Sequence, residues 1–550
     1  MKEERKLNLK FIIIAIISIS IFVIAIVPKE LQNDTFYTIK LGKLILDNGI
    51  DMQEHFAWHN DMPYTYPHWL YDVCIYLIFS IGGYHGLYIS TIIFGIILGI
   101  SIYLTNVKLT KNTIFPFFTT IFVLFVGKDF IAARAQLITF ILFVLTIYCI
   151  ECFLETKKKR YIIYLFLIPT LIANIHAAVF PFYFILYLPY IGEYIYSLLF
   201  KDRNLIIKFL IRTDEIEIIN LKYKKNKKEK HLEKLEILNK RIEENKQRLQ
   251  NELENKESYK IIVNKNDNCK WLIIIMLIAI LTGFLTLIGD TPYTYLYKTM
   301  IGNTTENISE HLPIVLYNSI EILLIISVEI ILIALTKIKI KLSDLFLFAG
   351  LVFLTIMSRR QQSMLLFVGI IVINRTFVQL IKIYDEKNIE GILKFLTSIT
   401  AKIIIFTLFI SYTIFQINKT KDVEYVSNET YPIEATKYIK ENLDLNSIKL
   451  FNEYNFGSYL LLNDIPVFID SRADVYDPKF NGFDDDIFKD FIKIIGLNCD
   501  YEERFEHYGI THIITYKDSS LDKILNKDEL YNELYKDKKF VIYERLTANK

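Results

Sequence analysis

Several features that mark other classes of protein are scarce in this sequence. Lysine and arginine (63) nearly balance aspartate and glutamate (61), which argues against nucleic acid as a partner. Only five cysteines are present, mostly in or beside apolar runs, so neither a disulfide framework nor a cysteine metal site is predicted. No convincing internal repeat is visible, although transporters and flippases usually contain one. A lipid or polysaccharide transporter is therefore a disfavoured alternative.

Apolar residues, in contrast, are abundant. They make up 52% of the 550 residues, and aromatic residues alone make up 14%, which is more than soluble domains usually contain. We therefore expect a polytopic α-helical membrane protein. Runs that approach the ~20 residues of a spanning helix lie at 11 to 28, 86 to 105, 114 to 127, 136 to 154, 161 to 173, 178 to 200, 271 to 289, 314 to 336, 345 to 357, 363 to 382 and 400 to 417.

The first apolar run indicates how the chain enters the membrane. It follows the basic segment MKEERKLNLK and ends at Pro28 without a small-residue cleavage site, which is typical of a retained anchor rather than a signal peptide. The basic start places the N-terminus in the cytoplasm. We expect a multi-pass protein of the plasma membrane.

One further apolar stretch, residues 69 to 81, decides the topology. If it crosses the membrane, the basic segments 157 to 160, 201 to 270 and 337 to 341 all lie outside, against the positive-inside bias. If it is a short interfacial or re-entrant helix, all three segments are cytoplasmic. The second version predicts about eleven spans and an extracytoplasmic C-terminus.

Four segments follow from this topology. Residues 1–200 form an N-terminal membrane module whose first external loop is long (29–85), and residues 271–417 form a second group of transmembrane helices. Between them, residues 201–270 mix Glu and Lys with Leu and Ile at helical spacing, which predicts a cytoplasmic helix or helical hairpin. The alternative for this insert is a solvated charged loop without a partner.

The polar tail, residues 418–550, is long enough for one small domain. PIEATKYIKENL predicts a helix, and SIKLFNEY, IPVFIDS, YGITHIITY and KKFVIYERL predict strands, so we expect an extracytoplasmic α/β domain over the membrane part. Asp470 and Arg472 follow a predicted strand, where loops of α/β sheets commonly bind ligands. They recognise an acceptor or form a structural ion pair.

Charged and polar residues collect on the predicted outer side. Because charges at membrane depth are costly, a converging set indicates a polar cavity. A single histidine such as His176 is more often structural, and Arg359 and Arg360 could simply cap a helix end. The set comprises Asp34, His55, His59, His68, Asp129, Arg134, Asn174, His176, Glu310, His311, Arg359 and Arg360.

Asp34 is the most specific candidate. It follows the first span and begins an amphipathic stretch that would lie along the membrane surface, where the phosphate of a lipid sits. A carboxylate there can act as general base toward an acceptor hydroxyl. The alternative is a helix N-cap, worth about 1 kcal/mol.

These motifs resemble the GT-C superfamily of integral-membrane glycosyltransferases, which includes oligosaccharyltransferases and protein O-mannosyltransferases. Asp34 matches the early acid of the first external loop, YPHWL its polar and aromatic turn, and Asp129 the acid of the next loop. ENISEHLP is similar to the external-loop glutamate motif, with Glu310 in the matching place. The tail resembles most those of bacterial GT-C-like proteins of unassigned substrate. Asn33 precedes Asp34 instead of a second acid, and a tryptophan-rich acceptor motif is missing.

The resemblance implies transfer of a sugar, with inversion, from a polyprenyl-phosphate carrier to an extracytoplasmic glycan, lipid or protein. Membrane lipids would surround the protein. Asp34 would be the catalytic base, and Mg²⁺ or Mn²⁺, if used, would be held by Asp34, Asp129 and Glu310. A non-catalytic GT-C-like scaffold is the alternative. Substrate binding would fall to His68, Arg134, His176, Arg359, Arg360, Asp470 and Arg472.

Overall fold

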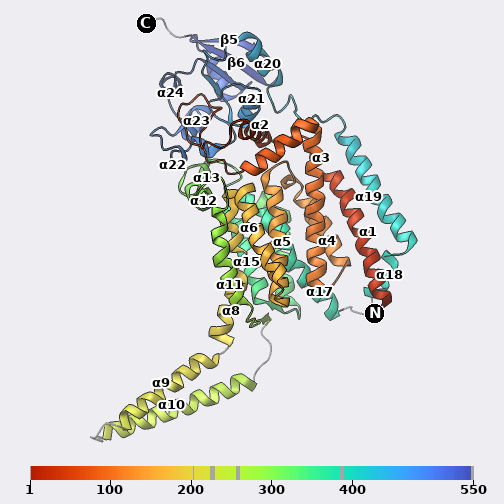
Figure 1. Cartoon of the computed structure of the whole chain (residues 1–550), viewed down its shortest axis with the longest axis vertical. Coiled ribbons are helices and arrows are strands. Elements are labelled where there is room, and N and C mark those ends of the chain that lie inside the picture. Colours follow the sequence, from red (N-terminus) through yellow and green to blue (C-terminus); the bar gives the residue numbers. More distant parts are fainter. Residues whose placement is uncertain (1, 202, 223–228, 255–259, 385–388, 547–550) are drawn as a thin grey trace.

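The protein has three parts arranged along one long axis. The computed structural model describes residues 2–546 apart from 202, 223–228, 255–259 and 385–388. A helix bundle forms the middle, with the C-terminal domain at one end and a helical hairpin projecting from the other (Figure 1). The N-terminus lies at the hairpin end of the bundle. The predicted insert and the predicted tail domain are therefore at opposite ends of the molecule.

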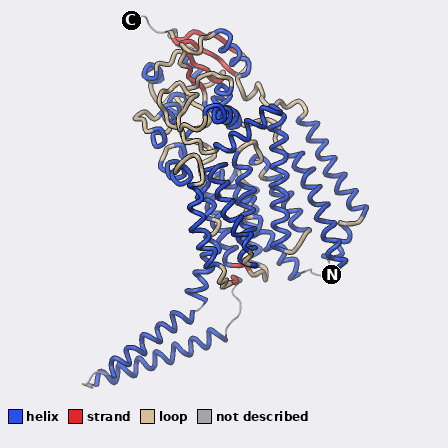
Figure 2. The backbone as a smooth tube through the Cα atoms, viewed as in Figure 1, coloured by secondary structure: helices blue, strands red, loops and turns tan. Residues whose placement is uncertain are grey.

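The bundle is built from apolar helices of very different lengths (Figure 2). Its helices are α1 (Lys2–Ile26), α3 (Trp69–Thr110), α4 (Ile114–Val126), α5 (Ala135–Thr156), α6 (Lys159–Ile175), α7 (Phe180–Ile185), α8 (Leu188–Tyr196), α11 (Cys269–Ala279), α14 (Ile320–Leu335), α15 (Leu342–Met357), α16 (Gln362–Phe367), α17 (Ile370–Tyr384), α18 (Ile389–Leu396) and α19 (Ile399–Thr420).

Five of the described helical segments are long and apolar enough to cross a membrane, or six if a bent pair near residue 368 forms one span. Three shorter apolar helices lie among them. These features support a multi-pass helical membrane protein, and the number of eleven spans stays a prediction. The five segments are Arg5–Ile26, Trp69–Thr110, Ala135–Thr156, Ala177–Leu199 and Ile399–Thr420.

Helix α3 is in fact two helical segments. The backbone of Gly83 has φ 55° and ψ −150°, which breaks the helix and which a residue with a side chain adopts only under strain. The first segment lies across the end of the bundle, and the second runs down its length (Figure 1). The predicted short helix at residues 69 to 81 is therefore separate from the span that follows it, and its depth in the membrane stays a prediction.

The C-terminal domain contains a four-stranded sheet of order β3-β4-β6-β5, in which only β3 and β4 are parallel. The described part of the domain also contains six α-helices. The elements are α20 (Ile433–Asn442), β3 (Leu450–Asn452), α21 (Tyr454–Leu462), α22 (Pro478–Asn481), α23 (Ile487–Ile495), α24 (Tyr501–Tyr508), β4 (His512–Tyr516), α25 (Ser520–Leu525), β5 (Tyr531–Lys536) and β6 (Phe540–Arg545).

Three of the four predicted strands of this domain are present, as β3, β4 and β6, and the predicted helix is α20. The prediction of a strand in IPVFIDS is wrong. Val467 makes only an isolated bridge, to Ala57 of the first external loop, because that loop lies along this side of the domain. Strand β5, whose sequence YNELYK is mostly polar, was not predicted.

The first external loop and the tail share one hydrophobic core. The ring of Phe36 in α2 (Asn33–Asn48) packs edge-on against Tyr431 and Tyr459, with centroids 4.9 and 5.4 Å apart. The Trp58 indole donates a 2.9 Å hydrogen bond to the carbonyl of Leu450. Loop and tail therefore lie together at one end of the bundle, as expected if both are on the same side of a membrane.

The charged insert forms the predicted helical hairpin, from α9 (Arg203–Lys222) and α10 (Glu229–Glu254). Residues 202, 223–228 and 255–259 of the predicted insert lie outside the described residues. The two helices bury Ile218, Leu238 and Ile242 against each other, and the Arg241 guanidinium binds both oxygens of Asp214. The described part of the insert is thus a pair of packed helices, joined by apolar contacts and ion pairs, and not a solvated loop.

Candidate active site

A polar pocket opens at the end of the bundle that faces the C-terminal domain. Its volume is about 310 Å³ including the open mouth. Nearby, the Asn33 amide donates to the backbone carbonyl of Tyr454 in the C-terminal domain. The lining residues come from α2, the starts of α3 and α5, the end of α6 and the turn η6 (Arg359–Gln361), and they are Asp34, Tyr37, Thr38, His68, Tyr71, Arg134, Ala135, Gln136, His176 and Arg360.

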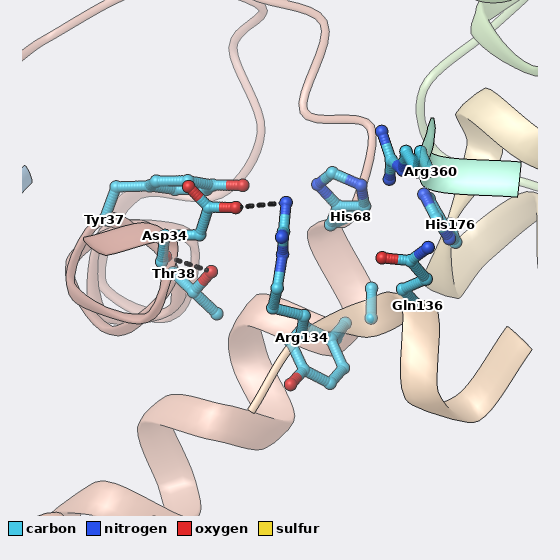
Figure 3. A pocket seen from close by; sticks show the side chains of 10 residues that line it. Asp34, Tyr37, Thr38, His68, Arg134, Gln136, His176 and Arg360 are labelled. Atoms are coloured by element: carbon cyan, nitrogen blue, oxygen red, sulfur yellow. Dashed lines mark hydrogen bonds and ion pairs between the residues drawn. The ribbon is translucent and has the colours of Figure 1, made fainter. Parts of the chain in front are cut away.

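Asp34 and Arg134 form the central ion pair of this pocket. Arg134 Nη2 lies 2.5 Å from Asp34 Oδ2, and both side chains are about a quarter exposed (Figure 3). Arg134 Nη1 also lies 3.5 Å from Glu310 Oε1. Asp34 Oδ1 makes no hydrogen bond with the part of the chain that the structure describes. One carboxylate oxygen of Asp34 is therefore oriented by arginine, and the other has no partner among the described residues.

Asp34 is not a helix cap. It lies in the first turn of α2, whose N-cap is Gln32, and the cap makes no side-chain hydrogen bond. The N-cap alternative for Asp34 is therefore wrong in this structure. The carboxylate still interacts favourably with the positive end of the helix dipole.

The two histidines of the pocket pack against each other. Their ring centroids are 4.9 Å apart, and Thr139 Oγ1 lies 2.9 Å from His176 Nδ1. Burial, together with the nearby Arg360 and Arg134, lowers the pKa of His68 to about 3. Burial and the neighbouring His68 likewise lower the pKa of His176 well below its ordinary range. Both rings are neutral near pH 7, so they offer hydrogen bonds rather than charge.

Arg360 brings a second arginine into the pocket. Its backbone N–H donates to the carbonyl of Glu310 at 3.0 Å, which ties η6 to the external loop that carries Glu310. Among the described residues its guanidinium makes no hydrogen bond or ion pair. Figure 3 shows Asp34 at one side of the pocket and Arg360 with His176 at the other, with Arg134 and His68 between them.

Five further lining residues were missed by sequence reasoning: Tyr37, Thr38, Tyr71, Ala135 and Gln136. Tyr37 and Thr38 are three and four residues after Asp34, and this spacing puts them on the same helix face as Asp34. This helical spacing was therefore the signal in the sequence that could have placed Tyr37 and Thr38 beside Asp34. Tyr71 and Gln136 similarly follow the predicted His68 and Arg134 by one turn or less.

Arg359 and Asp129 do not line the pocket. The side chain of Arg359 points elsewhere and donates to the carbonyl of Pro313 at 3.3 Å. Asp129 is exposed on η1 (Lys128–Phe130). Among the described residues no group of three or more His, Cys, Asp or Glu side chains is arranged to hold a metal ion. The tentative set of Asp34, Asp129 and Glu310 does not fit one here, because Arg134 contacts two of its members and the third lies apart.

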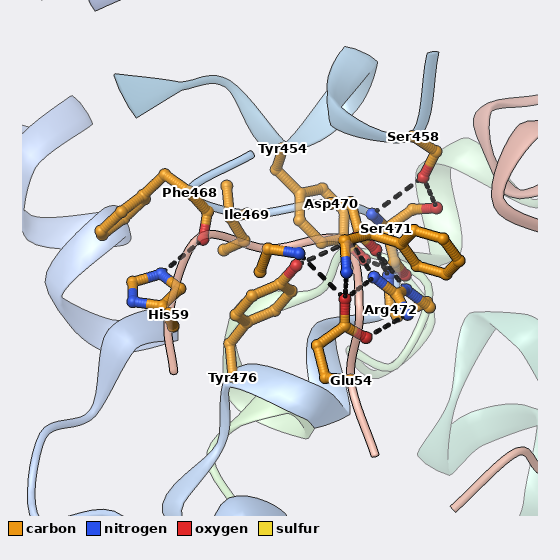
Figure 4. Close-up of polar contacts among 12 residues, drawn as sticks. Glu54, His59, Tyr454, Ser458, Phe468, Ile469, Asp470, Ser471, Arg472 and Tyr476 are labelled. Atoms are coloured by element: carbon orange, nitrogen blue, oxygen red, sulfur yellow. Dashed lines mark hydrogen bonds and ion pairs between the residues drawn. The ribbon is translucent and has the colours of Figure 1, made fainter. Parts of the chain in front are cut away.

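Asp470 and Arg472 lie outside the pocket, in the shared core of the first loop and the C-terminal domain (Figure 4). Arg472 pairs with Asp470 and Glu54, each at 2.5 Å, and all three side chains are at most 3% exposed. Tyr476 donates a 2.6 Å hydrogen bond to Asp470, and the guanidinium lies over the rings of Phe56 and Tyr64. This geometry favours the structural ion pair over acceptor recognition.

Comparison with known proteins finds solved structures of similar fold but no protein of similar sequence. No protein-family model matches the chain, and no curated protein matches its sequence. Two solved structures of the oligosaccharyltransferase AglB from Archaeoglobus fulgidus match it, one in the apo form and one in complex with an inhibitory peptide and a dolichol-phosphate. Each has a TM-score of 0.53 and 10% sequence identity, over 92% of this chain and 69% of the other. The chain therefore shares its overall fold with this oligosaccharyltransferase.

Proposed function

We propose that the protein is a membrane glycosyltransferase that transfers a sugar, with inversion, from a polyprenyl-phosphate carrier to an extracytoplasmic acceptor. The observation that carries the proposal is the pocket, on a fold shared with AglB. There, one oxygen of Asp34 and the guanidinium of Arg360 face each other, and neither is paired with another described residue. The AglB complex contains a dolichol-phosphate, which supports a lipid-phosphate donor here.

The proposed reaction needs a different group on each side of the anomeric carbon. At one end, Asp34 Oδ1 accepts the proton of the acceptor hydroxyl as its oxygen attacks the anomeric carbon. At the other end, the bond from that carbon to the phosphate oxygen breaks, and the phosphate leaves with the electron pair and the negative charge. Inversion requires the base and the leaving group on opposite sides of the reacting carbon.

Arg360 is the residue we assign to the departing phosphate, since it lies across the pocket from Asp34 and its guanidinium is unpaired among the described residues. Arg134 contacts Asp34 directly, so its role is to orient the base. Neutral His68 and His176 would donate hydrogen bonds to the sugar or the phosphate. Arg359, which lies outside the pocket, receives no role.

A non-catalytic scaffold is the second candidate, and one observation favours it. Asp34, Arg134 and Glu310 form a connected ion-pair network that would by itself tie α2, α5 and the external loop together. A scaffold would retain this network for stability alone. In the glycosyltransferase, Asp34 pairs with Arg134 and also accepts a proton from the acceptor. In the scaffold, Asp34 only pairs with Arg134.

The decisive experiment replaces Asp34 by Asn in the full-length protein. Asn keeps the size of the side chain and removes the basic oxygen, so the transfer rate from a panel of polyprenyl-phosphate sugars should fall ~10²-fold or more while carrier binding is retained. Asp47→Asn, an exposed change on the same helix, is the matched control and should leave the rate unchanged.

The outcomes separate the two candidates. A wild-type protein that transfers no sugar from the panel, combined with an Asp34→Asn variant of reduced stability, supports the scaffold. An active wild-type protein whose Asp34→Asn variant keeps its full rate contradicts the role of Asp34. Replacing Arg360 by Gln should weaken carrier binding, whereas Arg359→Gln should not.

A further inference from the structure

A second pocket lies at the opposite end of the bundle, near the origin of the hairpin. Its volume is about 860 Å³ including the open mouth. It is formed by the end of α3, the start of α15, the second half of α17, and the short parallel pair β1 (Ile261–Ile262) and β2 (Ile340–Lys341), whose strands are visible below the bundle in Figure 2. The lining residues are Leu109, Thr110, Ile262, Lys339, Ile340, Lys341, Asp344, Arg375, Thr376, Val378, Gln379 and Lys382.

The pocket carries more positive than negative charge. Arg375 is already engaged, since it lies 2.8 Å from Glu151 and also pairs with Asp344. The ammonium groups of Lys339, Lys341 and Lys382 make no hydrogen bond or ion pair with the described part of the chain. Four cations thus line the pocket with one carboxylate, Asp344, and Glu151 and Glu329 lie behind it, against Arg375 and Thr376. The remaining positive charge is carried by three lysines around one cavity.

The remaining walls are apolar. Leu109, Ile262, Ile340 and Val378 line the cavity beside the lysines. A small soluble anion would interact with the lysines but would gain nothing from these apolar side chains. A molecule with an anionic head and an apolar body would contact both, because apolar surface buried against such walls is favourable by roughly 25 cal/mol per Å².

The position of the pocket fits such a molecule. It lies where the apolar helices of the bundle end, on the side of the charged hairpin and of the N-terminus. This is the side that the distribution of basic residues predicts to be cytoplasmic, and the cytoplasmic leaflet is the one rich in anionic lipids. Basic cavities between membrane helices at that depth suit lipid headgroups.

We propose that this pocket binds the phosphate group of an anionic phospholipid, with Lys339, Lys341 and Lys382 around the headgroup and the apolar wall against its glycerol and first acyl carbons. The Arg375–Glu151–Asp344 cluster holds α5, α15 and α17 together behind it. The site is independent of the pocket at the other end and of the reaction proposed there.

Native mass spectrometry of the full-length protein in detergent can test this, with phosphatidylglycerol, phosphatidylcholine and inorganic phosphate as the probes. The wild-type protein should retain phosphatidylglycerol and not phosphatidylcholine. Neutralising all three lysines (Lys339→Ala, Lys341→Ala, Lys382→Ala) should weaken retention about a hundredfold, since each lysine near a lipid phosphate contributes roughly a fivefold factor.

Two further variants control for charge and for folding. Lys157→Ala, Lys158→Ala and Lys159→Ala together remove three exposed lysines from the same end of the bundle and should leave retention unchanged. Replacing the three pocket lysines by arginine keeps the charge and should preserve it. Equal retention by the wild type and the alanine variant of the pocket would overturn the proposal. Displacement of phosphatidylglycerol by millimolar inorganic phosphate would overturn its assignment to lipid.

Discussion

We predict that replacing Arg472 by Met destabilises the C-terminal domain. Arg472 is the cation that pairs with Asp470 and Glu54 in the core shared by the first loop and this domain. The guanidinium makes four side-chain hydrogen bonds to Asp470 and Glu54. Without it, two carboxylates that are 0% and 1% exposed lose their counterion. Removing one partner of a buried ion pair costs about 3–5 kcal/mol, a large part of the ~5–15 kcal/mol that stabilises a typical domain.

The assay is urea-induced exposure of the C-terminal domain to a pulse of protease, with the full-length protein in detergent. Arg504→Met is the matched control: Arg504 lies 3.5 Å from Asp490 with 31% of its side chain exposed, so its loss should cost less than about 1 kcal/mol. If Arg472→Met and Arg504→Met unfold at the same urea concentration, the reasoning is refuted. A loss of acceptor use at unchanged stability would instead restore acceptor recognition.

Two other predictions concern topology and pH. In a cysteine-free background, Lys246→Cys in the hairpin and Lys538→Cys in the C-terminal domain should be labelled from opposite sides of the membrane; labelling of both from one side would disprove the assigned topology. Because the pKa of His68 is about 3 in the folded protein and ~6.5 when unfolded, protons favour the unfolded state between these values, and stability should fall as the pH drops from 7 to 4.5. His68→Asn should reduce that fall by about 2 kcal/mol in thermal unfolding, and an unchanged pH profile would show that His68 is not buried neutral.

The candidate pocket was largely predictable because its charges are rare at membrane depth. Asp34, His68, Arg134, His176 and Arg360 are far apart in the sequence, yet each is a polar residue at the end of an apolar run, and such ends meet at one face of a bundle. The choice between Arg359 and Arg360 was not predictable. The two are adjacent in a single 3₁₀ turn, and which one faces the pocket depends on how η6 docks against the loop of Glu310.

The tail was harder to predict because its partners are distant in sequence. IPVFIDS has the composition of a strand, but its neighbour in space is the first loop, which offers Val467 one bridge instead of a ladder. Asp470 and Arg472 resemble a ligand-binding loop only until Glu54, 418 residues before Arg472, completes the ion pair. Sequence patterns report local periodicity, so a core assembled from both ends of the chain escapes them.

The sharing of one core by the first loop and the tail also sets an order of events during synthesis. Trp58 lies 392 residues ahead of its hydrogen-bond partner Leu450, so at ~5–20 residues per second it emerges roughly 20–80 s before that partner exists. During this interval α2 can already pack against the first segment of α3, where Gly42 lies against Asp72 and Tyr76, but the aromatic residues that contact the tail still lack their partners. The core of the first loop is therefore completed only after the C-terminal domain has been synthesised.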